Sequence, residues 1–317
     1  VEGGVNALFG GNDPHDDSGI IKYVRIEFAG IEFVTFQEIN GLTLAGVGDK
    51  TVVEYVQSSY SGDDAFECFG GTVNAKYLVA FRTWDDDFDS DLGYSGKMQF
   101  LVGLRDPMRA DISNSNGIES DNDPNGTASQ PFTQPVFSNV SLFGPLPDAS
   151  YSNQYDTQHR RGVWIQNRSK ASVFNSVVAG WPVSLQIDGR YTAESARNGE
   201  IVFRNNVLAG VRKDEAHYGF YYSIPSSQFD VKAWAAQNAV GCDTFDLNAE
   251  VKIADPFNLE NPRFTPSPQS PALTGADFGH PKLQDPFFER VSFRGAFGNE
   301  DWTSGWTNFD PQNTKYE

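Results

Sequence analysis

The chain has 317 residues and a formal net charge of −18 at pH 7. This acidity argues against binding to nucleic acid or to anionic lipid surfaces, because both need a basic footprint. No run of about 18 apolar residues could span a bilayer, and the two cysteines, Cys68 and Cys242, provide no disulfide framework. Thirty glycines, 17 prolines and 14% aromatic residues favour many turns and β structure.

Short runs typical of β-strands recur through the first two thirds of the chain. Apolar and polar positions alternate in them, which is the pattern of a strand. One class of predicted strands comprises residues 23–30, 54–57, 77–81, 136–144, 173–180 and 203–210. A second class comprises residues 41–44, 163–166 and 183–187. The two classes alternate without strong helix periodicity as far as residue 211. We therefore expect an all-β fold, a right-handed parallel β-helix in which stacked coils bury one continuous core.

Three segments repeat an apolar residue that is flanked by acids. The aligned positions are Asp64, Asp86 and Asn116, then Phe66, Phe88 and Ile118, then Glu67, Asp89 and Glu119. Successive copies are 22 and 30 residues apart, an inexact period of the kind that solenoids show. If the repeats stack, the apolar residues lie above one another in the core and the acids form a ladder along one side.

Asn139, Asn175 and Asn205 hold equivalent positions in three of the predicted strands. We expect each asparagine to lie at a corner and to bond its counterpart in the next coil, which would satisfy polar groups inside the turn. The alternative is that asparagine is simply common in turns. Residues 104–135 and 145–162 are too long for one coil, and we expect them to loop out on one face, where such loops often carry binding.

The pattern changes after residue 212. Residues 231–237 predict a short helix, with its start in residues 227–230. The tail from residue 254 is rich in proline and phenylalanine and predicts an irregular wrap, with Trp302 and Trp306 as anchors of a cap rather than a sugar platform. The expected organisation is β-helix coils over 1–211, followed by the last coils, a helix and a C-terminal cap over 212–317.

The acidic ladder is the first candidate functional site. Ca²⁺ takes six to eight oxygen ligands, and carboxylates stacked about 5 Å apart must bind a cation or take up protons. The predicted metal ligands are Asp63, Asp64, Glu67, Asp86, Asp89, Asp91, Glu119 and Asp121. The alternative is that these side chains bond turns of the backbone and that lysine or arginine neutralises the rest.

A glycan is the expected ligand beside this ladder, because long solenoid faces suit polymers and aromatic rings stack on sugars. The predicted ligand-binding residues are Trp84, Asp85, Asp87, Tyr94 and Arg105.

The sequence supplies no firm catalytic residue. Lys97, just after the ladder, is a weak candidate for the base of a β-helix polysaccharide lyase, but nearby acids would raise its pKa and make it a poor base. Asp64 and Asp86 are weak candidates for acid–base work on a glycosidic bond. The Gly-His-Gly string of polygalacturonase-type hydrolases is absent, which weakens that interpretation.

Several strings resemble a group of secreted or cell-surface β-helix proteins of Bacteroidota, over nearly the whole chain. They lie at residues 19–30, 40–44, 60–64, 69–77, 85–89, 93–97, 119–123, 294–298 and 308–311. The resemblance implies a right-handed parallel β-helix, export to the cell surface, and a lipid anchor or sorting signal outside this segment. It also implies further coils before Val1. Such proteins are mostly uncharacterised, so the resemblance implies no reaction.

The expected function is therefore an exported cell-surface protein for binding or adhesion, with polysaccharide or glycoprotein glycan as partner, possible Ca²⁺, and no turnover. One alternative is a polysaccharide lyase or glycosidase of the β-helix type. Another is a structural subunit that contacts other outer-membrane proteins.

Overall fold

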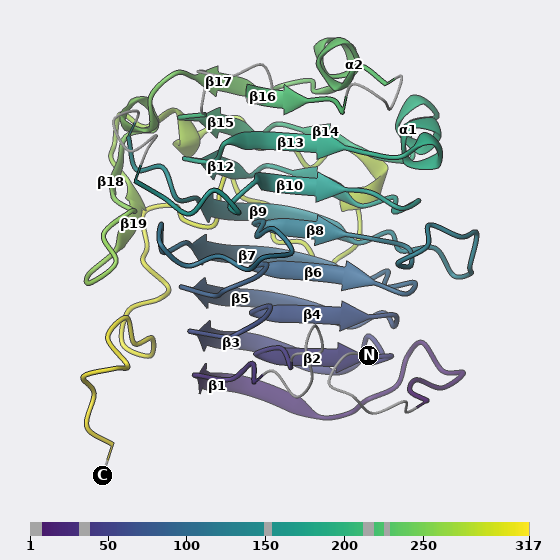
Figure 1. Ribbon diagram of the computed structural model, residues 1–317, viewed down its shortest axis with the longest axis horizontal. Coiled ribbons are helices and arrows are strands. Elements are labelled where there is room, and N and C mark those ends of the chain that lie inside the picture. The colour runs from purple at the N-terminus through teal and green to yellow at the C-terminus, as the bar shows by residue number, and fades with distance from the viewer. Residues whose placement is uncertain (1–7, 32–38, 149–153, 212–218, 225–228, 317) are drawn as a thin grey trace.

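The computed structural model describes residues 8–31, 39–148, 154–211, 219–224 and 229–316. Within these residues, parallel strands stack into two long sheets that face each other across the core (Figure 1). Each coil contributes to a ten-stranded sheet and to a seven-stranded sheet, and as far as β9 (Val136–Phe143) the strand in the ten-stranded sheet is the longer one. The fold is a parallel β-helix, as the sequence predicted.

The ten-stranded sheet is built in stacking order from β1 (Ile20–Glu27), β3 (Val52–Ser59), β5 (Asn74–Phe81), β7 (Lys97–Leu104), β9 (Val136–Phe143), the pair β11 (Ser172–Phe174) and β12 (Val177–Ala179), the pair β14 (Phe203–Arg204) and β15 (Val207–Ala209), and β17 (Asp243–Phe245). The seven-stranded sheet is built from β2 (Leu42–Ala45), β4 (Phe66–Phe69), β6 (Phe88–Asp91), β8 (Ile118–Ser120), β10 (Arg161–Ile165), β13 (Val183–Ile187) and β16 (Gly219–Tyr222).

The acid-flanked repeat sets the register of the seven-stranded sheet. Phe66 on β4 pairs with Phe88 on β6, and Phe88 pairs with Ile118 on β8. All three side chains are buried, and the two phenylalanine rings stack with centroids 5.6 Å apart. The predicted apolar column is therefore confirmed, and the residues on either side of it must face outward because side chains alternate along a strand.

The long strands bend at one residue per coil, which has a positive φ. The values are 54° at Tyr55, 58° at Tyr77, 60° at Phe100 and 55° at Asn139. This conformation is unfavourable for bulky side chains, and stacking offsets part of the cost. The rings of Tyr55 and Tyr77 lie 4.4 Å apart, and those of Tyr77 and Phe100 lie 5.2 Å apart.

The three aligned asparagines occupy this same bend, each with a positive φ. The expectation that they bond one another is wrong. The Nδ2 atoms of Asn139 and Asn205 donate to the backbone oxygens of Phe293 and Gly275, at 2.9 and 3.1 Å. Their partners belong to the C-terminal tail, which lies against the bends and supplies main-chain groups at the right spacing.

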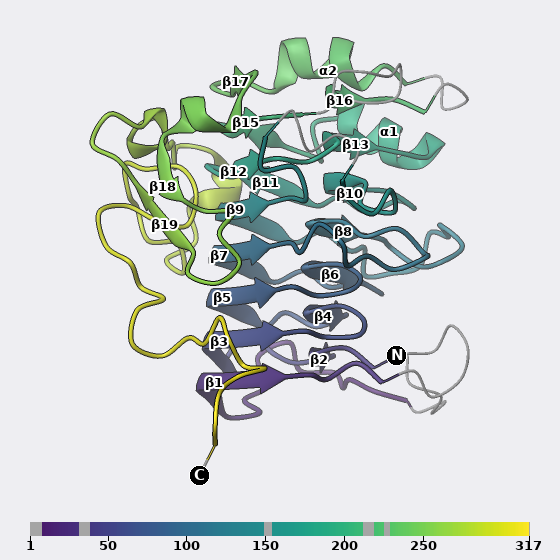
Figure 2. The ribbon, with the colours of Figure 1, turned by 60° about the vertical axis from the view of Figure 1, so that its left-hand side comes forward.

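The tail runs back along the ten-stranded sheet and brings the C-terminus to the end of the stack where β1 lies (Figures 1 and 2). It begins with the antiparallel pair β18 (Ile253–Asp255) and β19 (Arg263–Pro266), and includes the 3₁₀ turns Pro271–Leu273 and Pro281–Leu283. Trp302 stacks on Phe297 at 5.0 Å and meets Tyr77 edge-on at 5.3 Å. Trp306 packs edge-on against Tyr55 at 5.9 Å. The two tryptophans thus anchor the tail.

Two short α-helices lie beside the last coils. The helix α2 (Val231–Asn238) confirms the predicted helix, and the Asp230 side chain caps it by accepting from Ala233 N at 2.9 Å. A second helix, α1 (Arg190–Arg197), lies before residue 211, in the part of the chain where the sequence shows no strong helix periodicity. It buries a narrow face of small residues, including Ala193 and Ala196. That face is too weakly apolar to stand out in the sequence.

The segment 104–135 is not one insertion. The strand β8 divides it into a loop before the seven-stranded sheet and a loop after it. The first of these loops meets the later loop 145–162, because Ser115 and His159 form a parallel bridge. This contact places both loops beside the turns that lead into β6 and β8.

Candidate metal and ligand site

Carboxylates gather on the outer face of the seven-stranded sheet and in the turns that lead into it. Glu67 on β4 pairs in register with Asp89 on β6, and Glu119 follows on β8. Adjacent strands lie about 4.8 Å apart, so these outward side chains are close neighbours. We call the following seven residues the acidic face: Asp63, Asp64, Glu67, Asp85, Asp86, Asp89 and Glu119.

Two groups of three carboxylates lie close enough to share a metal ion. Asp63, Asp64 and Asp85 each offer an oxygen atom within 4.8 Å of the other two, and so do Asp64, Glu67 and Asp89. Asp64 belongs to both groups. Asp85, which the sequence suggested as a glycan contact, thus lies among the candidate metal ligands.

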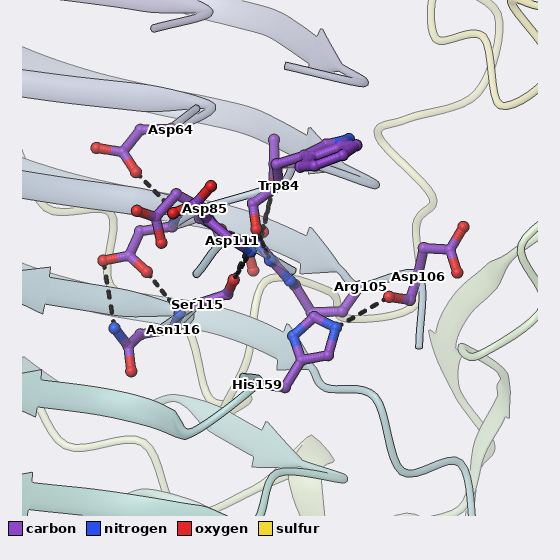
Figure 3. Close-up of polar contacts among 12 residues, drawn as sticks. Asp64, Trp84, Asp85, Arg105, Asp106, Asp111, Ser115, Asn116 and His159 are labelled. Carbon is purple, nitrogen blue, oxygen red and sulfur yellow. Dashed lines mark hydrogen bonds and ion pairs between the residues drawn. The ribbon is translucent and has the colours of Figure 1, made fainter. Parts of the chain in front are cut away.

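Asp64 and Asp86 also bond the backbone of the next coil. Asp86 N donates to Asp64 Oδ1 at 2.7 Å, and Asn116 N donates to Asp86 Oδ1 at 2.5 Å (Figure 3). The alternative interpretation, in which each turn aspartate bonds its own backbone, is not what these two bonds show. The bonded backbone groups belong to the following coil, so these two side chains tie coils together.

Burial and mutual repulsion change the acidity of these groups. Burial, with the charges of neighbouring acids, holds the pKa values of Asp64 and Asp89 well above their usual range. Burial also raises the pKa of Glu119 strongly and that of Asp86 less, because Asp86 accepts hydrogen bonds from Glu119 and from Asn116. Burial and mutual repulsion thus favour the protonated form of part of this face when no cation is bound.

Asp91 and Asp121 form a second acidic column beside the first. Asp91 ends β6 two residues after Asp89, and Asp121 follows β8. Burial, with the charge of Asp91, raises the pKa of Asp121 to about 7. Neither residue belongs to the two groups that lie within 4.8 Å.

Arg105 is buried and holds the turn that carries Trp84 and Asp85 (Figure 3). Its Nη1 donates to Asp85 O at 2.5 Å and its Nη2 donates to Trp84 O at 3.0 Å. Its Nη1 also pairs with Asp87 Oδ1 at 2.9 Å, and both side chains of this ion pair are fully buried. The Asp87 carboxylate packs so closely against Gly103 that a Cβ there would lie 2.2 Å from Asp87 Oδ2.

The expectation that Arg105 and Asp87 contact a ligand is therefore corrected, because they shape the turn from inside. Tyr94 needs the same correction: its ring is fully buried, and its hydroxyl donates to Val73 O at 2.8 Å. Lys97 opens β7 in the other sheet and pairs with Asp285 of the tail at 3.1 Å. Its expected place beside the acidic ladder is wrong, because the turn between β6 and β7 carries the chain to the other sheet.

Trp84 is the exposed aromatic residue of this turn, with 42% of its surface accessible. The guanidinium of Arg109 lies 5.5 Å from its ring centre, and part of the residue is open to solvent. Among the predicted ligand-binding residues, Trp84 is exposed, whereas Asp85 is half-buried and its Oδ1 atom is shielded from solvent.

Sequence reasoning gave no functional role to two residues near the site, His159 and Arg161. His159 is buried, its Nε2 lies 3.0 Å from Asp106 O, and burial with the charge of Arg105 holds its pKa well below the usual range (Figure 3). The imidazole is thus neutral and donates from Nε2 to the carbonyl. Arg161 opens β10, with its guanidinium 3.9 Å from the ring centre of Trp164. The adjacent pair Arg160 and Arg161, directly before a predicted strand of so acidic a chain, was the available signal for Arg161.

The fold and the site define an acidic parallel β-helix with clustered outward carboxylates. The family model described as pectate-lyase like β-helix domain matches residues 3–249, and the chain belongs to this family. No curated protein and no solved structure matches the chain significantly. In the part of the chain that the structure describes, no helix has the length and apolar character needed to cross a bilayer.

Proposed function

We propose that this protein binds glycan chains at the acidic face, with a divalent cation, Ca²⁺, as the bridge. The observation that carries the proposal is that two sets of three carboxylates, which share Asp64, each have oxygen atoms within 4.8 Å of one another. Oxygen atoms of this kind are the ligands that Ca²⁺ prefers. Within the first group, Asp85 Oδ1 is buried and has no hydrogen-bond donor among the described residues, so an acceptor atom remains for an ion.

The glycan part of the proposal rests on the family and on the surroundings of the acids. The family is named for its likeness to pectate lyase, which acts on a polysaccharide. The exposed Trp84 lies next to Asp85 and offers an aromatic surface on which a sugar ring could stack. A bound cation would attract sugar hydroxyl or carboxylate oxygens that the acids alone would repel.

We propose binding without turnover, at a cell surface after export. Lys97 lies on the other sheet in an ion pair, and Arg105 is enclosed with Asp87. Neither cation can therefore act as a base on a chain that lies across the acidic face. Export and surface location follow from the resemblance of the sequence strings and stay a prediction.

A polysaccharide lyase is the second candidate, and Arg161 is the observation that favours it. Burial lowers the pKa of its guanidinium, and the negative charges of Glu119 and Asp86 oppose this shift. In such a reaction a base removes the proton next to a uronate carboxylate, and the glycosidic C–O bond breaks to leave a double bond. Arg161 also donates from Nε to Gln186 Oε1 at 2.7 Å, which holds the side chain along the sheet and favours a positioning role.

A glycan array, probed with added Ca²⁺ and again with chelator, tests the binding proposal. We expect Ca²⁺-dependent binding that Asp89→Asn abolishes and that Glu260→Gln, at an exposed acid of the tail, leaves intact. Binding that chelator does not change would contradict the bridging role. If unsaturated uronide products form at an enzymatic rate, measured by their absorbance, and Arg161→Ala abolishes their formation, the lyase would replace the binding proposal.

A further inference from the structure

A pocket lies between the tail and the ten-stranded sheet, away from the acidic face. Its volume is about 500 Å³, which is in the range of small-molecule sites, about 300–1,000 Å³. Three rings of the bend column, Tyr55, Tyr77 and Phe100, line it from the coils. The tail closes the other side with residues that include Phe293, Glu300 and Trp302.

The walls of this pocket are aromatic and held in place. Tyr77 is stacked between Tyr55 and Phe100, at 4.4 and 5.2 Å. The indole Nε1 of Trp302 donates to Ala296 O at 2.8 Å, which fixes this ring edge-on against Tyr77 at the wall of the pocket. The walls are preorganised, because these side chains are already fixed without a ligand, so little side-chain entropy is lost on binding.

The charge of the pocket comes from Glu300. The other lining carboxylate, Glu289, is neutralised by Lys76 at 2.7 Å and accepts from the Tyr77 hydroxyl at 3.3 Å. Glu300 is exposed and has no hydrogen-bond or ion-pair partner among the described residues. The pocket therefore presents one uncompensated negative charge beside aromatic rings, and this combination suits a cation.

Beside this pocket, the protein already places one of its own ammonium groups between an aromatic ring and a carboxylate. The ammonium of Lys76 lies 4.8 Å from the ring centre of Phe287 while it pairs with Glu289. An ammonium between a ring and a carboxylate is thus already part of this surface. Glu300 lines the same pocket as the rings of Phe293 and Trp302, so a ligand ammonium bound there would find a carboxylate and aromatic rings in its surroundings.

We propose that this pocket binds an amino sugar through its protonated amine, with the amine near Glu300 and the sugar ring against the aromatic walls. The proposal deepens the proposed glycan binding and rests on it for the choice of a sugar. A neutral or N-acetylated sugar lacks the charge that Glu300 requires, and a uronate would be repelled. The site is separate from the acidic face and needs no metal ion.

Isothermal titration calorimetry with a glucosamine disaccharide, in chelator and about 0.15 M salt to screen unspecific attraction, tests this site. We expect binding that Glu300→Gln weakens about tenfold, while the N-acetylated disaccharide binds at least tenfold more weakly to the unchanged protein. The exposed Glu260→Gln serves as the matched control and should leave the affinity unchanged.

Asp89→Asn, on the acidic face, separates the two glycan sites. If it leaves disaccharide binding intact while Glu300→Gln weakens it, the pocket under the tail is the site. If Asp89→Asn abolishes binding and Glu300→Gln does not, the amine binds the acidic face and the pocket proposal is overturned, although glycan binding stands. Absence of binding, or equal binding of the N-acetylated sugar, would also overturn it.

Discussion

Gln57 and Asn308 exchange two hydrogen bonds across 251 positions of sequence. Gln57 Nε2 donates to Asn308 O, and Asn308 N donates to Gln57 Oε1, both at 2.7 Å. Gln99 makes the same pair with Glu289, at 2.8 and 2.9 Å. A side-chain amide here does for the tail what a neighbouring strand does in a sheet, since it offers one donor and one acceptor. The tail is therefore bound as a strap, at defined steps along the stack.

Replacing Gln99 with alanine should destabilise the protein by about 1–3 kcal/mol, because the main-chain N–H and C=O of Glu289 lose their partners. Gln237→Ala, at an exposed position of α2, is the matched control and should change the free energy of unfolding by less than about 0.5 kcal/mol. Urea denaturation followed by tryptophan fluorescence measures both. A loss no greater than in the control would mean that the strap contributes little to stability.

Phe88→Ala should destabilise by about 3–5 kcal/mol, because it opens a cavity between the stacked rings of the core column. Phe88→Leu keeps most of the volume and should cost less. The shift in the urea midpoint measures the loss of stability in each variant, provided that the dependence of the unfolding free energy on urea concentration stays the same. A neutral Phe88→Ala would be incompatible with the stacking of Phe66, Phe88 and Ile118.

Chelator should lower the melting temperature and added Ca²⁺ should restore it, since a ligand that binds the folded state stabilises it by RT ln(1 + [L]/Kd). At a hundred times Kd the gain is about 2.7 kcal/mol. Asp89→Asn should remove this response. In chelator, the variant should melt no lower than the unchanged protein, because it replaces a buried, repelled carboxyl group by a neutral amide. An unchanged Ca²⁺ response in Asp89→Asn would exclude this residue as a ligand.

Stability in chelator should fall as the pH rises from about 5 to about 8. The folded-state pKa of Asp121, about 7, is raised above its ordinary value of 3.8. The folded state therefore binds this proton more tightly than the unfolded state, and its contribution is complete below the unfolded value and lost as the pH passes through about 7. Asp121→Asn should flatten this part of a plot of urea midpoint against pH. A midpoint that rises across this range, in chelator, would contradict the shift.

The sequence by itself determined the fold class and the core column. Two local patterns were sufficient. The alternation within strands shows which faces are apolar, and the recurrence of Phe66, Phe88 and Ile118 at similar spacing shows how long a coil is. Because each coil contacts its neighbours in the same way, local spacing is enough to set the register. The same logic placed Glu67 beside Asp89, and the structure confirms that pairing.

Only the tertiary structure decided which polar residues face solvent and which lie inside. Tyr94, Asp87 and Arg105 are near the acids in sequence, yet burial turns them into supports of the fold. Lys97 is six residues beyond Asp91, yet one turn carries it to the other sheet. The strap bonds to Gln57 and Gln99 join residues more than 180 positions apart. No local pattern encodes such contacts, because they depend on the path of the tail after all the coils have stacked.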